Sequence, residues 1–484
     1  MASNQSFDIV QPEAAAVTES LRSIGYSMET AIADLIDNSI TAGATSISIS
    51  GTYRGSKTAL YILDNGCGMD VDTLKHAMRL GSSNPEEERE EKDLGRFGLG
   101  LKTASFSQCR KFTVISKKDG VVSGRYWDLD IINESNEWQL HSDYDPSYAA
   151  HLDSLDHGTI VVWEKLDRII SLKDRDAEKR FNAKKNNLRN HLGLTFHRFI
   201  EADTLTIEIG GVTVDAWNPF LPEKEFSQKK EVPEVVACDG AVRIKGWVMP
   251  HKAYFTEPEY KKAGYNRGWT NMQGFYVYRG GRLLVAGGWL GLTINGLPIR
   301  QEQHYDLARI CVDISNKQDF DWDIDIKKSK ATPPDYLRLQ LETVAHQTRR
   351  LAYQTYVYRG IPQKKRLSSG RPVVPLWTTA QERNNKLFYS INFDYPLIKD
   401  ILEDLGSSKT TKFRQLLKLL SETIPVQNID FHANDEAQKD FSNPFEGEDE
   451  EKNTIFNELV QSFIEQGYSK DEAVEQVSIL LKIQ

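Results

Sequence analysis

The sequence predicts an α+β fold, in which a helical segment precedes alternating strands and a second strand-rich region follows. Apolar residues recur at helical spacing from Pro12 to Asn38, and period-two alternation follows at Ser46–Ile49. A short apolar run at 59–63 then ends on a turn. The chain has 484 residues, of which 39% are hydrophobic and 27% charged. This length and composition predict a globular protein of about two to four domains.

Residues 1–200 are expected to form the first domain. Residues 81–100 are polar, charged and rich in glycine, which predicts a mobile loop that leads into a helix at Leu101. Strands are expected to return at 111–116 and 159–163. The first domain therefore combines a sheet with helices on either side of a long loop.

Residues 201–350 are strand-rich and are expected to form a second, mixed α/β domain. Two Gly-Gly pairs, at 210–211 and 280–281, are typical of hairpin turns between strands. The strand-like stretches read TLTIEIGG, VRIKGWVM, GFYVYRGGRLLV and ARICVDI.

The last third of the chain is predicted to be a small, mostly helical region with two linkers. Residues 351–372 form a basic connector, and 373–429 are a small mixed segment. Residues 430–451 hold nine acidic residues against Lys439, which is typical of a solvated linker. Helical periodicity over 452–484 predicts a helical hairpin or a three-helix mini-domain.

Composition excludes several classes of protein. The longest nearly uncharged stretch, around 283–297, is glycine-rich and shorter than the ~20 apolar residues that a membrane span needs. The N-terminus does not resemble a signal peptide, and the four cysteines are widely spaced, which suits a reducing interior. We therefore expect no membrane association and a cytoplasmic location, or a nuclear one in a eukaryote. The net charge of −9 argues against a wholly basic nucleic-acid binder. Local basic patches remain candidates for nucleic-acid contact, notably residues 173–189 with seven basic and three acidic residues.

The stretch ETAIADLIDNSITAGAT, residues 29–45, is the first candidate for a functional site. At about 100° per residue, Asp34, Asp37 and Asn38 share one side of a helix. The apolar residues of the same helix point broadly the other way. Alone, this pattern is typical of a solvated polar face, and the stretches that follow change that interpretation.

A glycine-containing motif comes next in the chain. Asp64 ends a strand in LDNGCGMD, with Gly66 and Gly68 just after it. A carboxylate there accepts a hydrogen bond from an exocyclic amine, and glycines let a planar base approach the backbone. Alone, the DxGxG motif is a common turn.

A second glycine cluster precedes a helix and resembles a phosphate-binding loop. Gly95, Gly98 and Gly100 lie in LGRFGLGLKTAS, where backbone N–H groups before a helix form an anion site. The Walker pattern is absent. The stretch HGTIVV then places Thr159 at the start of a strand, where its hydroxyl completes a pocket for adenine.

In this order, the motifs resemble those of the GHKL ATPases: gyrase B, the ninety-kilodalton heat-shock chaperones, sensor histidine kinases and MutL-type repair proteins. That pattern is an acidic residue four before an asparagine, then DxGxG, then GxxGxG, then a Gly-Thr strand, and all four occur across residues 29–163. The chain is most similar to MORC-type proteins and their prokaryotic relatives, most strongly over residues 10–165. The resemblance implies a Bergerat-type α/β sandwich ATPase domain followed by a transducer-like (S5-like) domain.

The resemblance also implies a role for each matching residue, with ATP and Mg²⁺ as cofactors. Asn38 is similar to the family's Mg²⁺ ligand, and Asp64 to its adenine-reading carboxylate, with Thr159 beside it through water. Asp34 occupies the place of the general base, and Asp37 is either a participant or a structural neighbour. The remaining ATP contacts implied by the motifs are Gly66, Gly68, Gly95, Gly98, Leu99, Gly100 and Lys102.

At the position of the base this chain carries aspartate, where most of the family carries glutamate. The missing methylene shortens the reach by about 1.5 Å, whereas a general base must lie within ~3.2 Å of its proton or act through one water. We therefore expect slow hydrolysis of ATP at Asp34 and a long-lived ATP-bound state.

The stretch DWDIDIKKSKATPP, residues 321–334, resembles the transducer loop from which a lysine reaches the terminal phosphate. The register favours Lys330, with Lys328 as the alternative. A solvated run of lysines is the structural explanation of the same stretch.

Two functions remain open. One is an ATP-gated homodimeric clamp on DNA, MORC-like or MutL-like, which in prokaryotic relatives extends to antiviral genome defence. The other is a chaperone-like or scaffold ATPase that binds a protein partner through residues 373–484.

Overall fold

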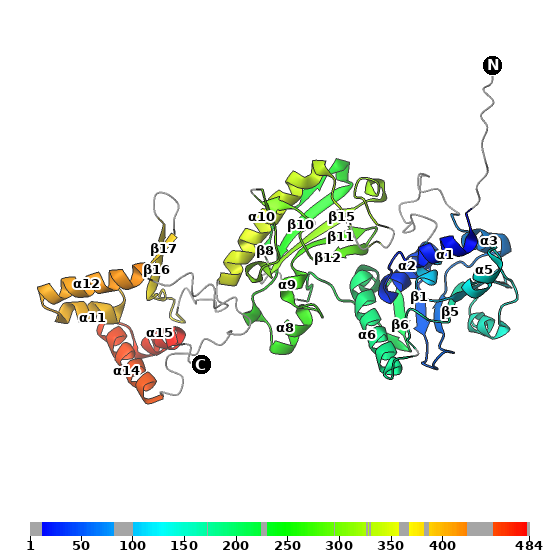
Figure 1. Ribbon diagram of the computed structural model, residues 1–484. Coiled ribbons are helices and arrows are strands. Elements are labelled where there is room, and N and C mark those ends of the chain that lie inside the picture. The colour runs from blue at the N-terminus through cyan, green and yellow to red at the C-terminus, as the bar shows by residue number, and fades with distance from the viewer. Residues whose placement is uncertain are drawn as a thin grey trace, which may run out of the picture. The chain divides into compact units, whose positions relative to one another are not determined.

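We analysed a computed structural model, which describes residues 12–81, 100–171, 173–223, 230–294, 296–325, 328, 331–357, 367–381, 387–423 and 449–481. The chain divides into two compact units, Met1–Arg359 and Gly360–Gln484, and each is described by itself. The described part of the first unit contains two large sheets, each with its own helices (Figure 1).

The first sheet contains seven described strands in the order β4-β3-β5-β2-β1-β6-β7. Neighbouring strands run antiparallel, except that β1 and β6 are parallel. The strands are β1 (Ser46–Ser50), β2 (Leu60–Asp64), β3 (Lys111–Lys118), β4 (Val121–Asp128), β5 (Gly158–Glu164), β6 (Thr206–Ile209) and β7 (Val212–Thr213).

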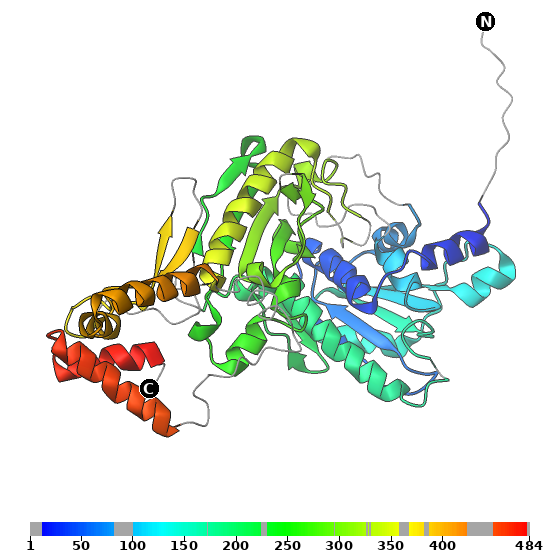
Figure 2. The ribbon, with the colours of Figure 1, turned by 60° about the vertical axis from the view of Figure 1, so that its left-hand side comes forward.

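Helices cover one face of this sheet, and an irregular segment covers the other (Figures 1 and 2). Alternation decides the faces: Ile47 and Ile49 on β1 pack beneath the helices, whereas Ile160 and Val162 on β5 pack against η1 (Pro146–Leu152). The helices of this part are α1 (Ala14–Arg22), α2 (Met28–Thr41), α3 (Val71–Met78), α4 (Gly100–Phe106), α5 (Leu129–Ser135), α6 (Ala177–Thr195) and α7 (His197–Glu201).

The first sheet extends further along the chain than the sequence predicts. The stretch TLTIEIGG was expected in the second domain, but β6 pairs in parallel with β1 and β7 follows it. Alternation identifies a strand without saying which sheet it joins, because pairing partners are far apart in the chain. Both Gly-Gly pairs do form hairpin turns with positive φ angles, as predicted.

The second sheet runs β12-β11-β15-β10-β8, with β9 paired to β10, and α10 packs against it (Figure 1). Its core contains the buried side chains of Ile244, Phe275 and Ile310 together with Leu341 of α10. The strands are β8 (Lys230–Glu231), β9 (Val235–Ala237), β10 (Val242–Val248), β11 (Gly274–Arg279), β12 (Arg282–Ala286) and β15 (Ala308–Ile314), beside the short pair β13 (Thr293–Ile294) and β14 (Leu297–Pro298). The helices are α8 (Glu257–Ala263), α9 (Trp269–Met272) and α10 (Asp335–Val357), and the 3-10 turns are η3 (Cys238–Gly240), η4 (Lys252–Tyr254), η5 (Gln303–Tyr305) and η6 (Asn316–Gln318).

The second unit has its own small core around Phe463 and Val477. The described strands β16 (Trp377–Gln381) and β17 (Leu387–Ile391) form a hairpin. α14 begins within the segment that the sequence predicts as an acidic linker. The helices are α11 (Pro396–Asp404), α12 (Ser407–Glu422), α14 (Asp449–Glu465) and α15 (Lys470–Leu481).

Candidate functional site

The acidic side of α2 is buried. Asp34 and Asp37 are 3% and 0% exposed, although Asn38 beside them is exposed to solvent. The helix begins at a capping box in which Ser27 accepts a hydrogen bond from the Thr30 backbone N–H. A solvated polar face, the structural explanation of this stretch, is therefore wrong for the two carboxylates.

Two cations from the second sheet and its following loop neutralise these carboxylates. Arg282, the first residue of β12, donates from Nε to Asp37 Oδ1 at 2.7 Å. Lys328 donates from Nζ to Asp37 Oδ2 at 2.5 Å and lies 3.4 Å from Asp34 Oδ1. Arg282 Nη2 lies 3.7 Å from that same Asp34 oxygen. Buried charges are stable only when they are paired, and here two carboxylates meet two cations.

The two carboxylate oxygens of Asp34 differ in their hydrogen bonds. Tyr26 donates from its hydroxyl to Asp34 Oδ2 at 2.7 Å, whereas Asp34 Oδ1 accepts no hydrogen bond from the described residues. Burial raises the pKa of Asp34, chiefly by desolvation; the charge of Lys328 and the Tyr26 hydrogen bond act in the opposite direction. A β-carbon placed on Gly100 would lie 3.9 Å from Asp34 Oδ2, so the start of α4 approaches this carboxylate.

Asp64 ends β2 and is fixed by two donors. Ser39 of α2 donates from Oγ to Asp64 Oδ2 at 2.8 Å, and the Gly66 N–H donates to Oδ1 at 2.9 Å. Burial raises the pKa of Asp64, against the opposing effect of these hydrogen bonds. Because a carboxylate has about four acceptor sites, Asp64 keeps capacity for a further donor such as an exocyclic amine.

The residues around Asp64 explain the glycines of the DxGxG motif. Gly66 packs so closely that a β-carbon would lie 2.9 Å from Ala42 Cβ. Gly68 has φ +66°, a conformation that other residues rarely adopt. Thr159 pairs with Asp64 in the register of β2 and β5, and its hydroxyl lies 2.8 Å from Ser116 Oγ. The structure therefore brings Asp64, Gly66 and Thr159 together.

Lys102 of α4 is almost completely buried and donates from Nζ to the Ala77 carbonyl at 2.9 Å. Burial lowers its pKa to about 8.

The other predicted residues of the phosphate loop, Gly95, Gly98 and Leu99, lie outside the described residues, and Gly100 begins α4. Lys330 also lies outside them, so its assignment stays a prediction. The alternative, Lys328, is the lysine that the structure places beside Asp34.

Sequence reasoning missed three residues of this site: Tyr26, Ser39 and Arg282. Ser39 directly follows Asn38, and its partner Asp64 was already assigned, so helical geometry offered a signal for it. Tyr26 directly precedes the N-cap residue of α2 and offered none. Arg282 follows a predicted hairpin turn, but nothing in the sequence links it to Asp37.

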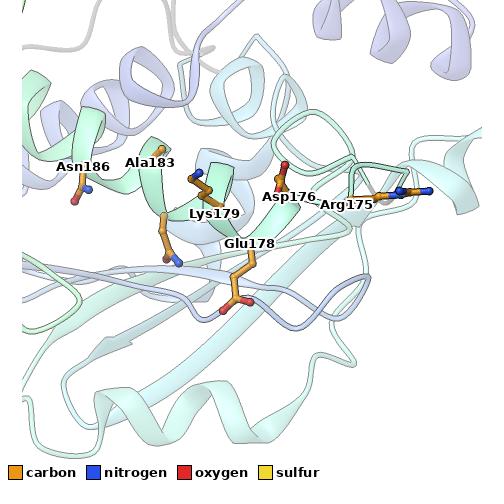
Figure 3. Close-up of a pocket in the computed structure, with 7 residues that line it drawn as sticks. Arg175, Asp176, Glu178, Lys179, Ala183 and Asn186 are labelled. Atoms are coloured by element: carbon orange, nitrogen blue, oxygen red, sulfur yellow. The ribbon is translucent and has the colours of Figure 1, made fainter.

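The basic stretch Lys173–Arg189, a candidate for nucleic-acid contact, lies mostly on α6. A surface pocket of about 640 Å³ opens along the first turns of this helix (Figure 3). Arg175 and Lys179 line it, but so do Asp176 and Glu178, together with uncharged residues at 182, 183 and 186. The mixed charge makes this pocket a poor phosphate site.

No helix in the described ranges is long and apolar enough to cross a membrane. Nor do the described histidine, cysteine, aspartate and glutamate side chains gather into a group of three or more that would hold a metal ion. Asn38 carries an amide and is not one of these four residue types. Its exposure fits an ion that keeps several waters and bridges phosphates, as Mg²⁺ does.

The fold of the first domain is an α/β sandwich of the GHKL class. Residues 26–159 match the family described as histidine kinase-, DNA gyrase B-, and HSP90-like ATPase. The first domain is thus an ATPase domain of this type, which confirms the predicted resemblance and fold class.

Relatives among known proteins are of the MORC type. The chain is 32% identical over 93 residues to ATPase morc-1 of Caenorhabditis elegans, and 35% identical over 96 residues to ATPase MORC2B of Mus musculus. It is 32% identical over 110 residues to Protein MICRORCHIDIA 6 of Arabidopsis thaliana. These matches cover 19%, 19% and 20% of this chain, but only 10%, 9% and 16% of the respective relatives. The similarity therefore characterises an ATPase domain and leaves the rest of each relative unmatched.

Proposed function

We propose that this protein binds ATP with Mg²⁺ and hydrolyses it slowly. The observation that carries the proposal is the junction of α2 with the end of β2, where Ser39 connects the helix of Asp34 and Asn38 to Asp64. In the proposed site Asp64 accepts a hydrogen bond from the adenine amine, with Thr159 beside it. Asn38 would hold Mg²⁺, which would neutralise charge on the phosphates of the bound nucleotide. Lys102, the Gly66–Gly68 turn and the loop of Gly95, Gly98, Leu99 and Gly100 complete the nucleotide contacts.

Asp34 is the proposed general base, acting from Oδ1. Tyr26 occupies Oδ2, so Oδ1 is the oxygen left to accept a proton from water. The raised pKa of Asp34 suits proton uptake, but the short side chain limits its reach. Lys328, and Lys330 by the register of the family, are the candidates for contact with the terminal phosphate. Slow turnover and a long-lived ATP-bound state follow from this arrangement.

We further propose that ATP binding makes the first domain dimerise and that the dimer acts as a clamp or switch on DNA. The similarity to MORC-type ATPases supports this, as does the basic character of residues 173–189, with seven basic and three acidic residues. A scaffold or chaperone-like ATPase with a protein partner is the second candidate. The second unit favours it, because Trp377, Leu419 and Leu420 expose 42%, 57% and 49% of their surface.

Binding of ATP to the parent protein and to Asp64→Asn tests the proposal. The amide presents a donor to the adenine amine, and the buried mismatch costs about 1–3 kcal/mol, or roughly fivefold to 150-fold in Kd. Asp239→Asn, the same substitution at an exposed turn beside the second sheet, is the control and should keep parental affinity. Equal ATP affinity in Asp64→Asn and the parent would contradict the adenine assignment.

A second experiment separates the clamp from the scaffold. Hydrolysis and dimerisation of the parent protein are measured with and without duplex DNA, at two salt concentrations.

A further inference from the structure

A buried ion cluster connects the two sheets of the first unit at α2. The side chains of Asp37, Arg282 and Lys328 are 0%, 4% and 8% exposed. Both oxygens of Asp37 are used, one by each cation, at 2.7 and 2.5 Å. Removing one partner of a buried pair leaves an uncompensated charge, so this geometry is strongly maintained.

The cluster fixes where the Lys328 ammonium lies relative to Asp34. Lys328 Nζ donates to Asp37 and at the same time lies 3.4 Å from Asp34 Oδ1, the oxygen without a hydrogen bond from the described residues. Lys328 also has φ +50°, a conformation that costs a residue with a side chain free energy. A backbone held in that conformation indicates that the surroundings determine the position of this lysine.

We propose that Asp37 and Arg282 are a positioning pair for the hydrolysis of ATP. Arg282 fixes Asp37 across the junction of the two sheets, and Asp37 holds Lys328 beside the base until the terminal phosphate arrives. When Lys328 moves to that phosphate, Arg282 keeps Asp37 neutralised. This inference rests on the proposed function, and it assigns roles to Asp37 and Arg282 that catalysis at Asp34 does not itself require.

Arg282→Gln is the variant that tests the pair. We expect kcat for ATP to fall on the order of tenfold or more, because without Arg282 the move of Lys328 to the phosphate would leave the buried Asp37 carboxylate unpaired, so Asp37 retains Lys328. The Kd for ADP, which lacks the terminal phosphate, should stay within about threefold of the parental value. Arg282→Lys keeps the charge and should recover part of kcat, which a purely structural loss does not explain.

The same hairpin offers a matched control. Arg279, the last residue of β11, is buried and pairs with the partly buried Asp319 through two contacts of 2.5 Å. Arg279→Gln breaks a similar pair without touching α2. It should lower thermal stability and leave kcat near the parental value.

A double-mutant cycle completes the experiment. If Asp37 and Arg282 act as a unit, Asp37→Asn combined with Arg282→Gln should reduce kcat about as much as either change alone. Additive losses would overturn the positioning pair. A parental kcat in Arg282→Gln, measured beside an active parent protein, would also overturn it. A loss of kcat in Arg279→Gln equal to the loss in Arg282→Gln would do the same. A parent protein that binds ATP but never hydrolyses it would overturn the proposed activity, and this positioning role with it.

Discussion

Tyr26 and Asp34 form the contact that most directly sets the chemistry of the proposed base. The Tyr26 hydroxyl donates to Asp34 at 2.7 Å and opposes the rise in pKa that burial causes. Tyr26→Phe removes this donor, so the pKa of Asp34 should rise further. A base with a higher pKa stays protonated to a higher pH, and the acid limb of the kcat profile should therefore move upward. Activity should fall more at about pH 6 than at about pH 8.

The pH profile of kcat, measured on the parent and on Tyr26→Phe, checks this prediction. Tyr148→Phe is the control, because burial and Glu164 raise the pKa of Tyr148 on the opposite face of the sheet, away from α2. That variant should keep the parental profile. An unshifted acid limb in Tyr26→Phe would mean that another group limits the rate at low pH.

At the residue scale, the sequence indicated which residues belong to the candidate site better than it indicated which side chains pair with them. Asp34, Asn38 and Asp64 were recognisable because their spacing within one helix and one turn is local. The cations that neutralise Asp37 come from β12 and from the loop that follows β15. Such contacts depend on how two domains pack, and no local pattern encodes them. For the same reason Asp37, a possible bystander in the sequence, proved to be the most fully paired carboxylate of the cluster.

At the scale of elements, α2 carries most of the site, and its first turn is stabilised by a capping box. Ser27→Ala removes the acceptor for the Thr30 N–H, which lies 3.2 Å from Ser27 Oγ. Losing such a cap costs about 0.5–2 kcal/mol, so the melting temperature of the first unit should fall by a few degrees. Differential scanning calorimetry measures this change.

A second capping box provides the matched control. In α15, Ser469 Oγ lies 3.3 Å from the Glu472 N–H, and the Glu472 side chain accepts from the Ser469 N–H at 2.9 Å. Because this helix belongs to the second unit, Ser469→Ala should lower only the melting transition of that unit. If Ser27→Ala also lowered that transition, the two units would not unfold independently.

Helices and strands were predicted where the apolar pattern is strong, as in α2 and β2. The two hairpin turns were predicted from their Gly-Gly pairs. Membership of a sheet was harder. β6 looked like the first strand of the next domain, since only its parallel pairing with β1 places it in the first sheet. A parallel neighbour is joined through a long crossover, and that connection leaves no mark on the strand's own sequence.

At the scale of the whole molecule, the short side chain of Asp34 has a consequence for assembly. In the proposed cycle, ATP closes the dimer and hydrolysis opens it, so slow chemistry prolongs the closed state. Asp34→Asn keeps the size of the side chain but cannot take a proton from water. It should bind ATP, lose most hydrolysis and remain dimeric for longer than the parent. Asp34→Glu restores the missing methylene and should hydrolyse ATP faster than the parent.

Light scattering after gel filtration, with ATP and Mg²⁺, measures the dimer, and phosphate release measures turnover. Asn38→Ala is the informative companion, because losing the proposed Mg²⁺ ligand should abolish ATP-dependent dimerisation while leaving the buried carboxylates paired. Parental turnover in Asp34→Asn would exclude Asp34 as the base. Asp37 is then a weak substitute, since both its oxygens accept hydrogen bonds from cations, and water activation would have to come from a group outside α2. A persistent dimer without turnover would instead tie the lifetime of the closed state to this one carboxylate.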